Sequence, residues 1–227
     1  MAEFVPTTFI DLGLIDYVKA WAFQEDIFNR NLKAKVTGTS TSNYLIFCEH
    51  NHVYTLGKSG IESNLLVNNR QLKELGVSFY KTNRGGDITY HGPGQIVGYP
   101  LLDLEQFGLG VKSYIHLLEE GIILSLRHFG LTGERMDGAT GVWLDVQDPP
   151  KVRKICAIGV KASRHLTMHG FALNVNTDLS FFKLINPCGF TDKAVTSLEK
   201  ELGVKQDYSL VNQVVKKSLA EVFGFLF

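Results

Sequence analysis

The spacing of apolar residues along the chain predicts three long helices. Residues 14–32, 111–129 and 211–222 each repeat apolar side chains at intervals of three and four, which gathers them on one helix face. These stripes are Leu14, Val18, Trp21, Phe28 and Leu32; Val111, Ile115, Leu118, Ile122, Leu126 and Phe129; and Val211, Val215, Leu219 and Val222. Gly224 follows the third stripe, where glycine commonly ends a helix. A shorter helix is predicted over residues 69–75.

Short apolar runs between the helices predict β-strands, because they are bounded by turn residues. They cover residues 8–12, 44–48, 77–82, 95–101, 141–146, 153–162 and 167–176. The resulting order is a strand, a helix, several strands, a second long helix, hairpin-like strands and a last helix. A doubly wound parallel sheet would require strict alternation of strands and helices, so we predict the α+β class.

Length and composition favour one globular domain spanning residues 1–227. A chain of 227 residues suits one domain better than two, and 44% hydrophobic residues is ordinary for a globular protein. Basic and acidic residues number 23 each, so the overall basic charge typical of nucleic-acid-binding proteins is missing. The first basic residue is Lys19 and no apolar run reaches the length of a membrane span, which argues against a targeting segment and a membrane protein.

The glycine-rich segment of residues 84–100 is the densest chemical signal. It holds five glycines in seventeen residues, which permits close approaches that side chains would forbid. The segment lacks the Lys-Ser/Thr ending of a P-loop and the glycine spacing of a dinucleotide fingerprint, and Pro93 removes an amide that a phosphate would need. We therefore predict a glycine-lined wall for a slender apolar ligand. A turn-rich connection between strands is the alternative.

The three cysteines lie in different surroundings. Cys48, Cys156 and Cys188 are widely spaced and odd in number, which favours reduced thiols in a cytoplasmic protein over a disulfide framework. Cys48 lies in an apolar strand, where a thiol is usually buried and inert. Cys188 lies in the Asn-Pro-Cys-Gly-Phe turn of residues 186–190, where a thiol can be reached. The turn alone leaves open whether Cys188 is a nucleophile or a small buried hydrophobe.

Lys154 stands near the start of a predicted strand. With period two it shares a strand face with Cys156, Ile158 and Val160. Such apolar surroundings disfavour the charged form of a lysine. The alternative is a lysine at a strand end whose ammonium reaches water.

The histidines offer two further hypotheses. His50 and His52 lie two residues apart and could face one metal ion, but a zinc site needs further ligands and no third is evident. His169 lies among apolar residues of one strand face, where a satisfied core histidine is the usual role. It can also be considered as the partner of Cys188 in a Cys–His dyad, although no third group that would orient the pair is identifiable.

Four motifs in order along the chain resemble those of the lipoyl(octanoyl) transferases, the octanoyl-carrier-protein:protein octanoyltransferases of lipoate synthesis. The motifs are Glu49-His50 with Val53-Tyr54-Thr55-Leu56-Gly57, Arg84-Gly85-Gly86-Asp87 with His91-Gly92-Pro93-Gly94-Gln95, Lys154 with Ala157-Ile158-Gly159, and His169-Gly170-Phe171-Ala172-Leu173-Asn174 leading to Asn186-Pro187-Cys188-Gly189. The Arg-Gly-Gly run and the Asn-Pro-Cys-Gly turn are specific in combination.

The resemblance implies an α+β fold with a mixed sheet flanked by helices, as in biotin and lipoate protein ligases. It implies a catalytic pair of Cys188 and Lys154, with no cofactor and no metal. The implied substrate-binding residues are Arg84, Gly85, Gly86, Asp87, Ile88, Thr89, Tyr90, His91, Ala157, Ile158, Gly159, Gly170, Phe171 and Ala172. At position 156 this chain has a cysteine where the family usually has a small residue. On the predicted face of Lys154 this thiol would crowd the site or compete as a nucleophile.

The implied reaction transfers an octanoyl or lipoyl group from octanoyl-acyl carrier protein to a lysine, through a thioester on Cys188. The implied acceptors are lipoyl domains of 2-oxoacid dehydrogenase E2 subunits and the glycine cleavage H protein; neither nucleic acid nor membrane is an expected partner. Carrier proteins are acidic, and the predicted basic contacts are Lys151, Arg153, Lys161 and Arg164. The alternatives are an ATP-dependent lipoate or biotin-type protein ligase and a non-enzymatic thiol or metal-binding protein.

Overall fold

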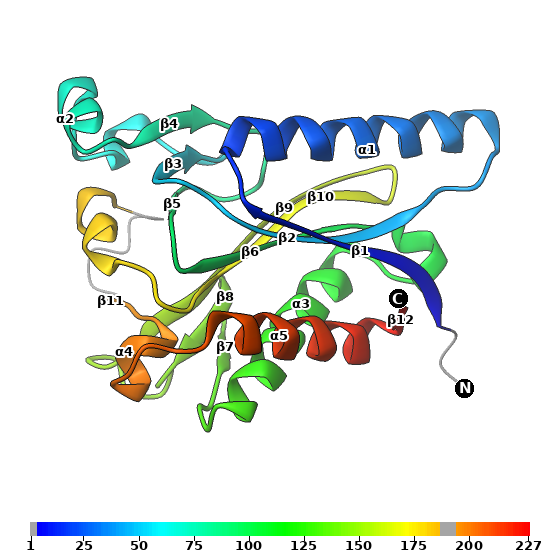
Figure 1. The fold of residues 1–227 in the computed structure, drawn as a ribbon. Helices are drawn as coiled ribbons and strands as arrows, with labels where there is room; N and C mark the ends of the chain where they lie inside the picture. Colours follow the sequence, from blue (N-terminus) through cyan, green and yellow to red (C-terminus); the bar gives the residue numbers. More distant parts are fainter. Residues whose placement is uncertain (1–3, 187–193) are drawn as a thin grey trace.

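A long mixed sheet runs through the centre of the protein, which the computed structural model describes for residues 4–186 and 194–227 (Figure 1). Within those residues nine strands form this sheet. In spatial order they are β12 (Phe225–Leu226), β1 (Val5–Leu14), β2 (Asn43–Glu49), β6 (Gln95–Leu101), β10 (Leu166–Asn174), β9 (Arg153–Ser163), β8 (Ala139–Leu144) and β7 (Glu134–Met136), with β11 (Ala194–Val195) paired to β9. β1 runs parallel to β2 and β12, and β11 runs parallel to β9; the other pairings are antiparallel.

A small sheet stands beside one end of the long one. It consists of β4 (Ser78–Lys81), β3 (Val53–Leu56) and β5 (Ile88–His91). β3 is the middle strand, parallel to β4 and antiparallel to β5. All four residues of β3 are buried, so this strand lacks the alternation of a half-exposed strand.

Helices cover both faces of the long sheet, which confirms the predicted α+β class. α1 (Tyr17–Thr37) lies over one face, and α3 (Val111–His128) and α5 (Tyr208–Phe223) lie over the other (Figure 1). The shorter helices are α2 (Asn69–Glu74), α4 (Leu198–Leu202) and the 3-10 turns η1 (Glu62–Asn64), η2 (Leu104–Phe107) and η3 (Leu179–Leu184). Throughout the described ranges, every helix is too short or too polar to cross a lipid bilayer.

The two faces of the long sheet carry separate apolar cores. Leu45, Phe47 and Leu173 face α3 and α5 and form the larger core with them. Ile46 and Ala172, which alternate with those residues, face the side covered by α1. The period of two along a strand therefore assigns each residue to one helix layer.

Helix α1 begins and ends as its sequence favours, but its buried face differs from the predicted stripe. Asp16 caps it, its carboxylate accepting the amides of Val18 and Lys19, and Gly38 ends it with φ of 69°. The predicted Leu14 belongs to β1 and is 61% exposed, and Val18 is 43% exposed. The helix instead buries polar as well as apolar residues: Oε1 of Gln24 accepts the amide of His169 in β10, and the Asn31 side chain bonds the backbone of Ser42 just before β2. The buried set is Tyr17, Ala20, Gln24, Ile27, Phe28 and Asn31.

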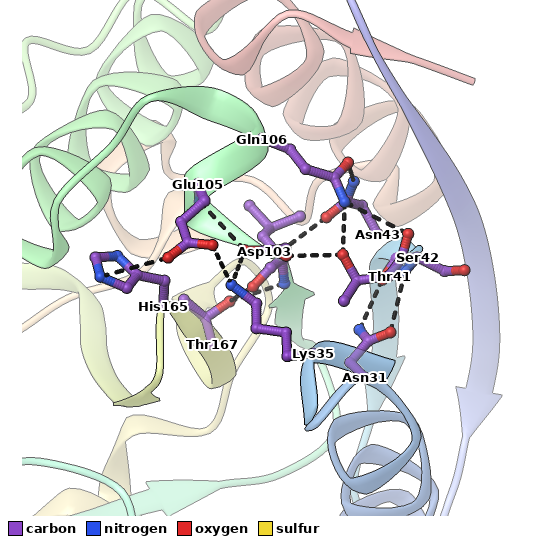
Figure 2. A network of polar contacts seen from close by, with 11 residues as sticks. Asn31, Lys35, Thr41, Ser42, Asn43, Asp103, Glu105, Gln106, His165 and Thr167 are labelled. Carbon is purple, nitrogen blue, oxygen red and sulfur yellow. Dashed lines mark hydrogen bonds and ion pairs between the residues drawn. The ribbon is translucent and has the colours of Figure 1, made fainter. Parts of the chain in front are cut away.

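A polar network fastens the C-terminal half of α1 to η2 (Figure 2). Lys35 lies 2.7 Å from the carboxylates of both Asp103 and Glu105. The Asp103 carboxylate also accepts the Thr41 hydroxyl at 2.7 Å, and the Asn31 side chain bonds the backbone of Ser42. The residues of this network line neither of the cavities described next, so its role is to join elements.

Candidate active site

A cavity of about 490 Å³ is lined by both sheets. The small sheet contributes residues 84–89, which belong to the glycine-rich loop between β4 and β5 and to the start of β5. The long sheet contributes residues 157–160 of β9, with Ala172 and Asn174 of β10. The volume and the mixture of apolar side chains with few polar groups are those of a small-molecule site.

A second cavity of about 50 Å³ adjoins the first. The two share Arg84, Thr89, Ala172 and residues 157–159. The smaller one is completed by side chains from α1, β5, β6 and β10, namely Tyr17, His91, Val97, Tyr99, His169, Gly170 and Phe171. We call the larger cavity the outer chamber and the smaller one the inner chamber; the residues they share lie between them.

The wall between the sheets is made of backbone. The amide of Gly85 donates to the carbonyl of Val160 at 2.9 Å, which joins the glycine-rich loop to β9. A Cβ atom on Gly159 would lie 2.9 Å from the carbonyl oxygen of Gly85, and Gly86 has φ of +83°. Side chains at these positions would push the loop away from the strand or strain it. The predicted glycine-lined wall is therefore present, and the packing needs its glycines.

Arg84 is a buried cation in the wall that both chambers share. Its Nη2 donates to the carbonyl of Thr55 at 2.5 Å, its Nε donates to the Thr55 hydroxyl at 3.2 Å, and its Nη1 donates to the carbonyl of Gly85 at 3.0 Å. Burial lowers the pKa of both His91 and His169 to about 3, and the Arg84 cation adds to this effect. Both imidazoles are therefore neutral at physiological pH. Among the described residues that line the inner chamber, Arg84 is then the one charged side chain.

A chain of amides fixes the tautomer of His91. Nδ2 of Asn174 donates to the carbonyl of Thr196 at 2.9 Å, so Oδ1 of Asn174 is the acceptor for Nε2 of Gln95 at 2.9 Å. Oε1 of Gln95 is then left to accept Nδ1–H of His91, at 2.8 Å. Nε2 of His91 consequently carries the lone pair and faces the Thr55 hydroxyl at 3.5 Å.

Lys154 lines the outer chamber. Its Nζ donates to the carbonyl of Thr140 at 3.1 Å and lies 4.4 Å from the centre of the Trp143 ring. Trp143 is also its register partner on β8. The predicted shared face of Lys154 and Cys156 is wrong, and a β-bulge is the reason.

The bulge turns Lys154 away from Cys156. Val142 of β8 pairs with Cys156, but the next residue, Trp143, pairs with Lys154, so β9 carries one extra residue at Ile155. Cys156 is fully buried in the core beneath the sheet, opposite Leu173, and lines neither chamber. Burial raises the pKa of its thiol. A thiol in that position neither crowds the site nor acts as a ready nucleophile.

Cys188 lies outside the described residues, but the chain on either side of it is described. The amide of Asn186 donates to the carbonyl of Asn64 at 2.7 Å, and the Asn64 side chain donates to Asp87 in the cavity wall at 2.6 Å. Eight positions after Asn186, β11 begins at Ala194 and pairs with Arg153 and Lys154 of β9. Ala194 and Val195 themselves line the outer chamber.

The predicted substrate-binding residues divide among three places. Arg84–Thr89, Ala157–Gly159 and Ala172 line the outer chamber, while His91, Gly170 and Phe171 line the inner one. Tyr90 lines neither; its hydroxyl bonds Nδ1 of His52 at 2.7 Å and its ring stacks on Phe181. Sequence analysis missed Trp143, Gln95 and Asn174 as site residues. Trp143 lies in the site because β8 pairs with β9 in this register, and the residues around position 143 in the sequence do not indicate that pairing.

His50 and His169 have hydrogen-bond partners of their own. Nδ1–H of His50 donates to the carbonyl of Ile15 at 2.8 Å and its Nε2 accepts the Tyr99 hydroxyl at 2.7 Å. Nε2 of His169 lies 2.7 Å from Oδ1 of Asn83. In residues 4–186 and 194–227, groups of three histidine, cysteine or carboxylate side chains able to hold a metal ion do not occur.

The predicted basic patch does not form. Arg153 is paired with Asp145 and with Glu201, the latter at 2.5 Å, so its charge is compensated. Lys161 lies near the other end of β9, where its ammonium is 4.6 Å from the centre of the Phe28 ring. Arg153 and Lys161 lie near opposite ends of the extended strand β9, so the predicted basic residues are not gathered in one patch.

Comparison with known proteins agrees with the motifs. The family described as the lipoyl protein ligase A/B catalytic domain matches residues 16–222. A protein of Parabacteroides distasonis named octanoyltransferase is 61% identical over 214 residues, which cover 94% of this chain and 97% of that protein. An octanoyltransferase of Cytophaga hutchinsonii is 51% identical over 221 residues, which cover 94% of this chain and 91% of that protein.

A solved structure agrees with the fold. Lipoate-protein ligase A bound with ATP superposes with a TM-score of 0.75 over 98% of this chain and 87% of that chain. The sequence identity is 16%, so this likeness concerns the fold alone. It confirms the expected mixed sheet flanked by helices in the arrangement of the lipoate ligases.

Proposed function

The chain belongs to the lipoyl protein ligase A/B catalytic domain family, as one of its lipoyl(octanoyl) transferases, and we propose that it carries an octanoyl group from acyl carrier protein to a lipoyl-domain lysine as a thioester on Cys188. The relatives named octanoyltransferase, at 61% and 51% identity, make it an acyltransferase of protein lipoylation. The carrier protein as donor, the thioester and the role of Lys154 are the parts of the proposal that go beyond those names. The proposed acceptors are lipoyl domains of E2 subunits and the glycine cleavage H protein.

The shape and lining of the outer chamber support an acyl ligand. Its wall combines the backbone of Gly85, Gly86 and Gly159 with the small side chains of Ala157 and Ala172. Small residues on facing strands leave a narrow space suited to an unbranched chain. The single observation that carries the proposal is that Lys154 opens onto this same space.

The surroundings of the three cysteines support Cys188 as the nucleophile. Cys48 and Cys156 are buried, line neither chamber, and have thiol pKa values raised by burial. Cys188 belongs to the segment that follows Asn186 and precedes Ala194, and Ala194 lines the outer chamber. A reactive thiol needs access and a nearby cation, and Lys154 supplies the cation at this chamber.

The proposed reaction has two balanced steps. The Cys188 thiolate attacks the thioester carbon of the octanoyl carrier; the carbon–sulfur bond to the carrier breaks, and the carrier thiol leaves with a proton given up by the Lys154 ammonium, which becomes neutral. The ε-amine of the acceptor lysine then attacks the enzyme thioester, forms an amide and releases the Cys188 thiolate. Lys154, once neutral, takes the proton that the attacking amine loses. A thioester is less stable than an amide, so the second step proceeds without ATP.

Intact mass spectrometry tests the proposal. The protein is incubated with octanoyl-acyl carrier protein, and we expect one octanoyl adduct that hydroxylamine removes and that peptide mapping assigns to Cys188. Adding an unmodified lipoyl domain without ATP transfers the group to that domain. Cys188→Ala abolishes both steps, while the matched Cys48→Ala variant retains them. Transfer that requires ATP, with no adduct on Cys188, would instead support the ligase activity found on the same fold.

A further inference from the structure

We propose that Trp143 is a positioning residue that holds the ammonium of Lys154 charged and directed into the outer chamber. The proposal rests on the proposed function, because it gives Lys154 its role beside Cys188. Nζ of Lys154 lies 4.4 Å from the centre of the Trp143 ring, and both residues line the chamber. A cation over the face of an indole is attracted by the negative face of the ring, and tryptophan is the strongest of the aromatic side chains in this respect.

The Trp143 ring is held rigidly. Its indole N–H donates to the carbonyl of Ala139 at 2.9 Å, and the side chain is 2% exposed. It packs with Ala139 and Val152 in a small apolar core separate from the larger ones. A ring fixed in this way presents one face to Lys154 at no further ordering cost.

A backbone carbonyl completes the surroundings of the ammonium. Nζ of Lys154 donates to the carbonyl of Thr140 at 3.1 Å, and Gly141 next to it has φ of 125°. A Cβ atom on Gly141 would lie 2.6 Å from the carbonyl oxygen of Cys156 and 3.4 Å from Cε of Lys154, so only glycine fits there. The amide of Gly141 donates to Glu119 at 3.0 Å, which fixes the turn. The π face and the carbonyl both favour the charged amine over the neutral one.

Other titratable groups surround Lys154 and have partners or positions of their own. Glu119 of α3 is paired with Arg135 of β7 at 3.2 Å, and Cys156 of β9 faces the other side of the sheet. The loop across the chamber brings Arg84 and Asp87. The comparison of Trp143→Phe with Trp143→Leu isolates the contribution of the aromatic face of Trp143 to the contact with Lys154.

The consequence concerns the thiol of Cys188. A lysine that stays charged beside a thiol stabilises the thiolate and lowers the thiol pKa. Removal of the ring makes the charged amine less favourable, so less thiolate forms at neutral pH. The pH at which Cys188 becomes half reactive should rise.

The test compares pH midpoints for the alkylation of Cys188 by iodoacetamide, read by peptide mapping. Trp143→Leu removes the ring and is expected to raise the midpoint by about half a unit to one unit. Trp143→Phe keeps an aromatic face but loses the indole N–H, and should raise it by less than half as much. Phe28→Leu is the matched control: Lys161 of the same strand lies 4.6 Å over Phe28, which lines neither chamber, so the midpoint should not move.

A second measurement keeps the test valid if Trp143→Leu does not fold. In a Trp21→Phe background Trp143 is the one remaining tryptophan of the chain. Biosynthetic incorporation of fluorotryptophan then places a fluorine on this ring, which withdraws electron density from it and leaves its shape almost unchanged. We expect a smaller rise of the midpoint in the same direction.

The outcomes separate this proposal from the proposed function. If the wild-type protein forms the Cys188 adduct and Lys154→Ala raises the midpoint, but neither Trp143→Leu nor the fluorinated ring does, the positioning role of Trp143 is wrong and the proposed function stands. Equal shifts for Trp143→Phe and Trp143→Leu likewise overturn it, because the π face is then not the cause. If no adduct forms on Cys188, the proposed function fails and this proposal falls with it.

Discussion

Lys154 and Cys156 lie two residues apart on β9 yet face opposite sides of the sheet. The bulge at Ile155 separates them: Lys154 pairs with Trp143 and lines the outer chamber, while Cys156 pairs with Val142 and is buried in the core against α3. A regular strand would have placed the thiol beside the ammonium. The bulge therefore keeps the Cys156 thiol out of the chamber that Lys154 lines.

Replacing Cys156 should leave octanoyl transfer almost intact. Cys156→Ala removes a buried sulfur that lines neither chamber, so we expect a loss of stability of about 1 kcal/mol from the small cavity it leaves. The rate of transfer and the octanoyl adduct should be unchanged, whereas Cys188→Ala abolishes both. An adduct that survives Cys188→Ala but disappears in Cys156→Ala would contradict the assignment of the nucleophile.

A larger side chain at the residues that both chambers share should discriminate between acyl chains. Ala157 lines both chambers and pairs with Ala172, which lines both as well. Ala157→Leu fills the space that a long chain crosses, so transfer of an octanoyl group should fall by about tenfold or more, with a smaller loss for a butanoyl group.

The control for this prediction is Ala162→Leu, because Ala162 is an exposed residue of the same strand. It should alter neither rate. Equal losses for both chain lengths in Ala157→Leu, accompanied by a fall in melting temperature, would show damage to the fold and not to the space for the acyl chain.

Periodicity predicted the large elements because each has one buried face. α3 and α5 begin and end within a few residues of the predicted stripes, and Asp207 caps α5 by accepting the amide of Leu210, with Gly224 ending it at φ of 70°. β3 was missed because all its residues are buried, and β5 because it lies in a segment whose glycines predict turns. The buried face of α1 was misassigned because Gln24 is buried by its bond to the amide of His169.

The candidate site was predictable only where a single segment carries it. The glycine wall of residues 84–86 and the lysine of β9 are evident in the sequence. The bulge at Ile155 is not, since it exists only in the pairing of β9 with β8. Trp143 lies in the site because of that pairing, and Asn174 because β10 pairs with β6. Both positions depend on strand register, which the sequence does not show.

Acid should destabilise the fold through its buried neutral histidines. Burial lowers the pKa of His91 and His169 to about 3, well below the value near 6.5 of an unfolded chain. The unfolded state therefore binds more protons below pH 6.5, so the stability present above that pH is lost as the pH falls from 6.5 toward 3. At pH 5.5 the loss is about 1.4 kcal/mol for each histidine. Urea unfolding at pH 7.5 and at pH 5.5 measures it.

A matched pair of variants isolates the contribution of His169. His169→Asn should reduce the difference in stability between the two pH values by about 1.4 kcal/mol. His165→Asn is the control, because His165 has the same φ of 61° but a side chain that is 55% exposed. The same reduction in both variants would mean that burial of His169 is not the source of the effect.

The two carboxylates that Lys35 contacts should contribute differently to the free energy of unfolding. Both lie 2.7 Å from its ammonium, but the Asp103 side chain is 7% exposed and that of Glu105 is 61% exposed (Figure 2). Asp103→Ala leaves the partly buried Lys35 ammonium and the Thr41 hydroxyl without this acceptor, so we expect a loss of about 2 kcal/mol in unfolding free energy. Glu105→Ala should cost less than about 1 kcal/mol. Equal losses in chemical denaturation would contradict the dependence on burial.

Replacing Lys154 should separate the two chemical steps by their pH dependence. An unperturbed cysteine titrates near 8.5, and a lysine cation within about 4–6 Å lowers that pKa by about one to three units. Lys154→Ala should therefore slow alkylation of Cys188 at pH 7 and move its midpoint upward. Raising the pH should restore acylation from the carrier, because hydroxide then generates the thiolate.

Transfer to the acceptor lysine should recover less well in Lys154→Ala, since that step also needs a group that accepts the proton of the attacking amine. Two pH–rate curves for each protein, one for alkylation and one for transfer, make the comparison. Lys161→Ala is the matched control, because Lys161 belongs to the same strand but lines neither chamber. If the midpoint for Cys188 is the same with and without Lys154, the lysine does not activate the thiol. If both steps recover equally at high pH, Lys154 acts on the thiol alone and another group accepts the proton.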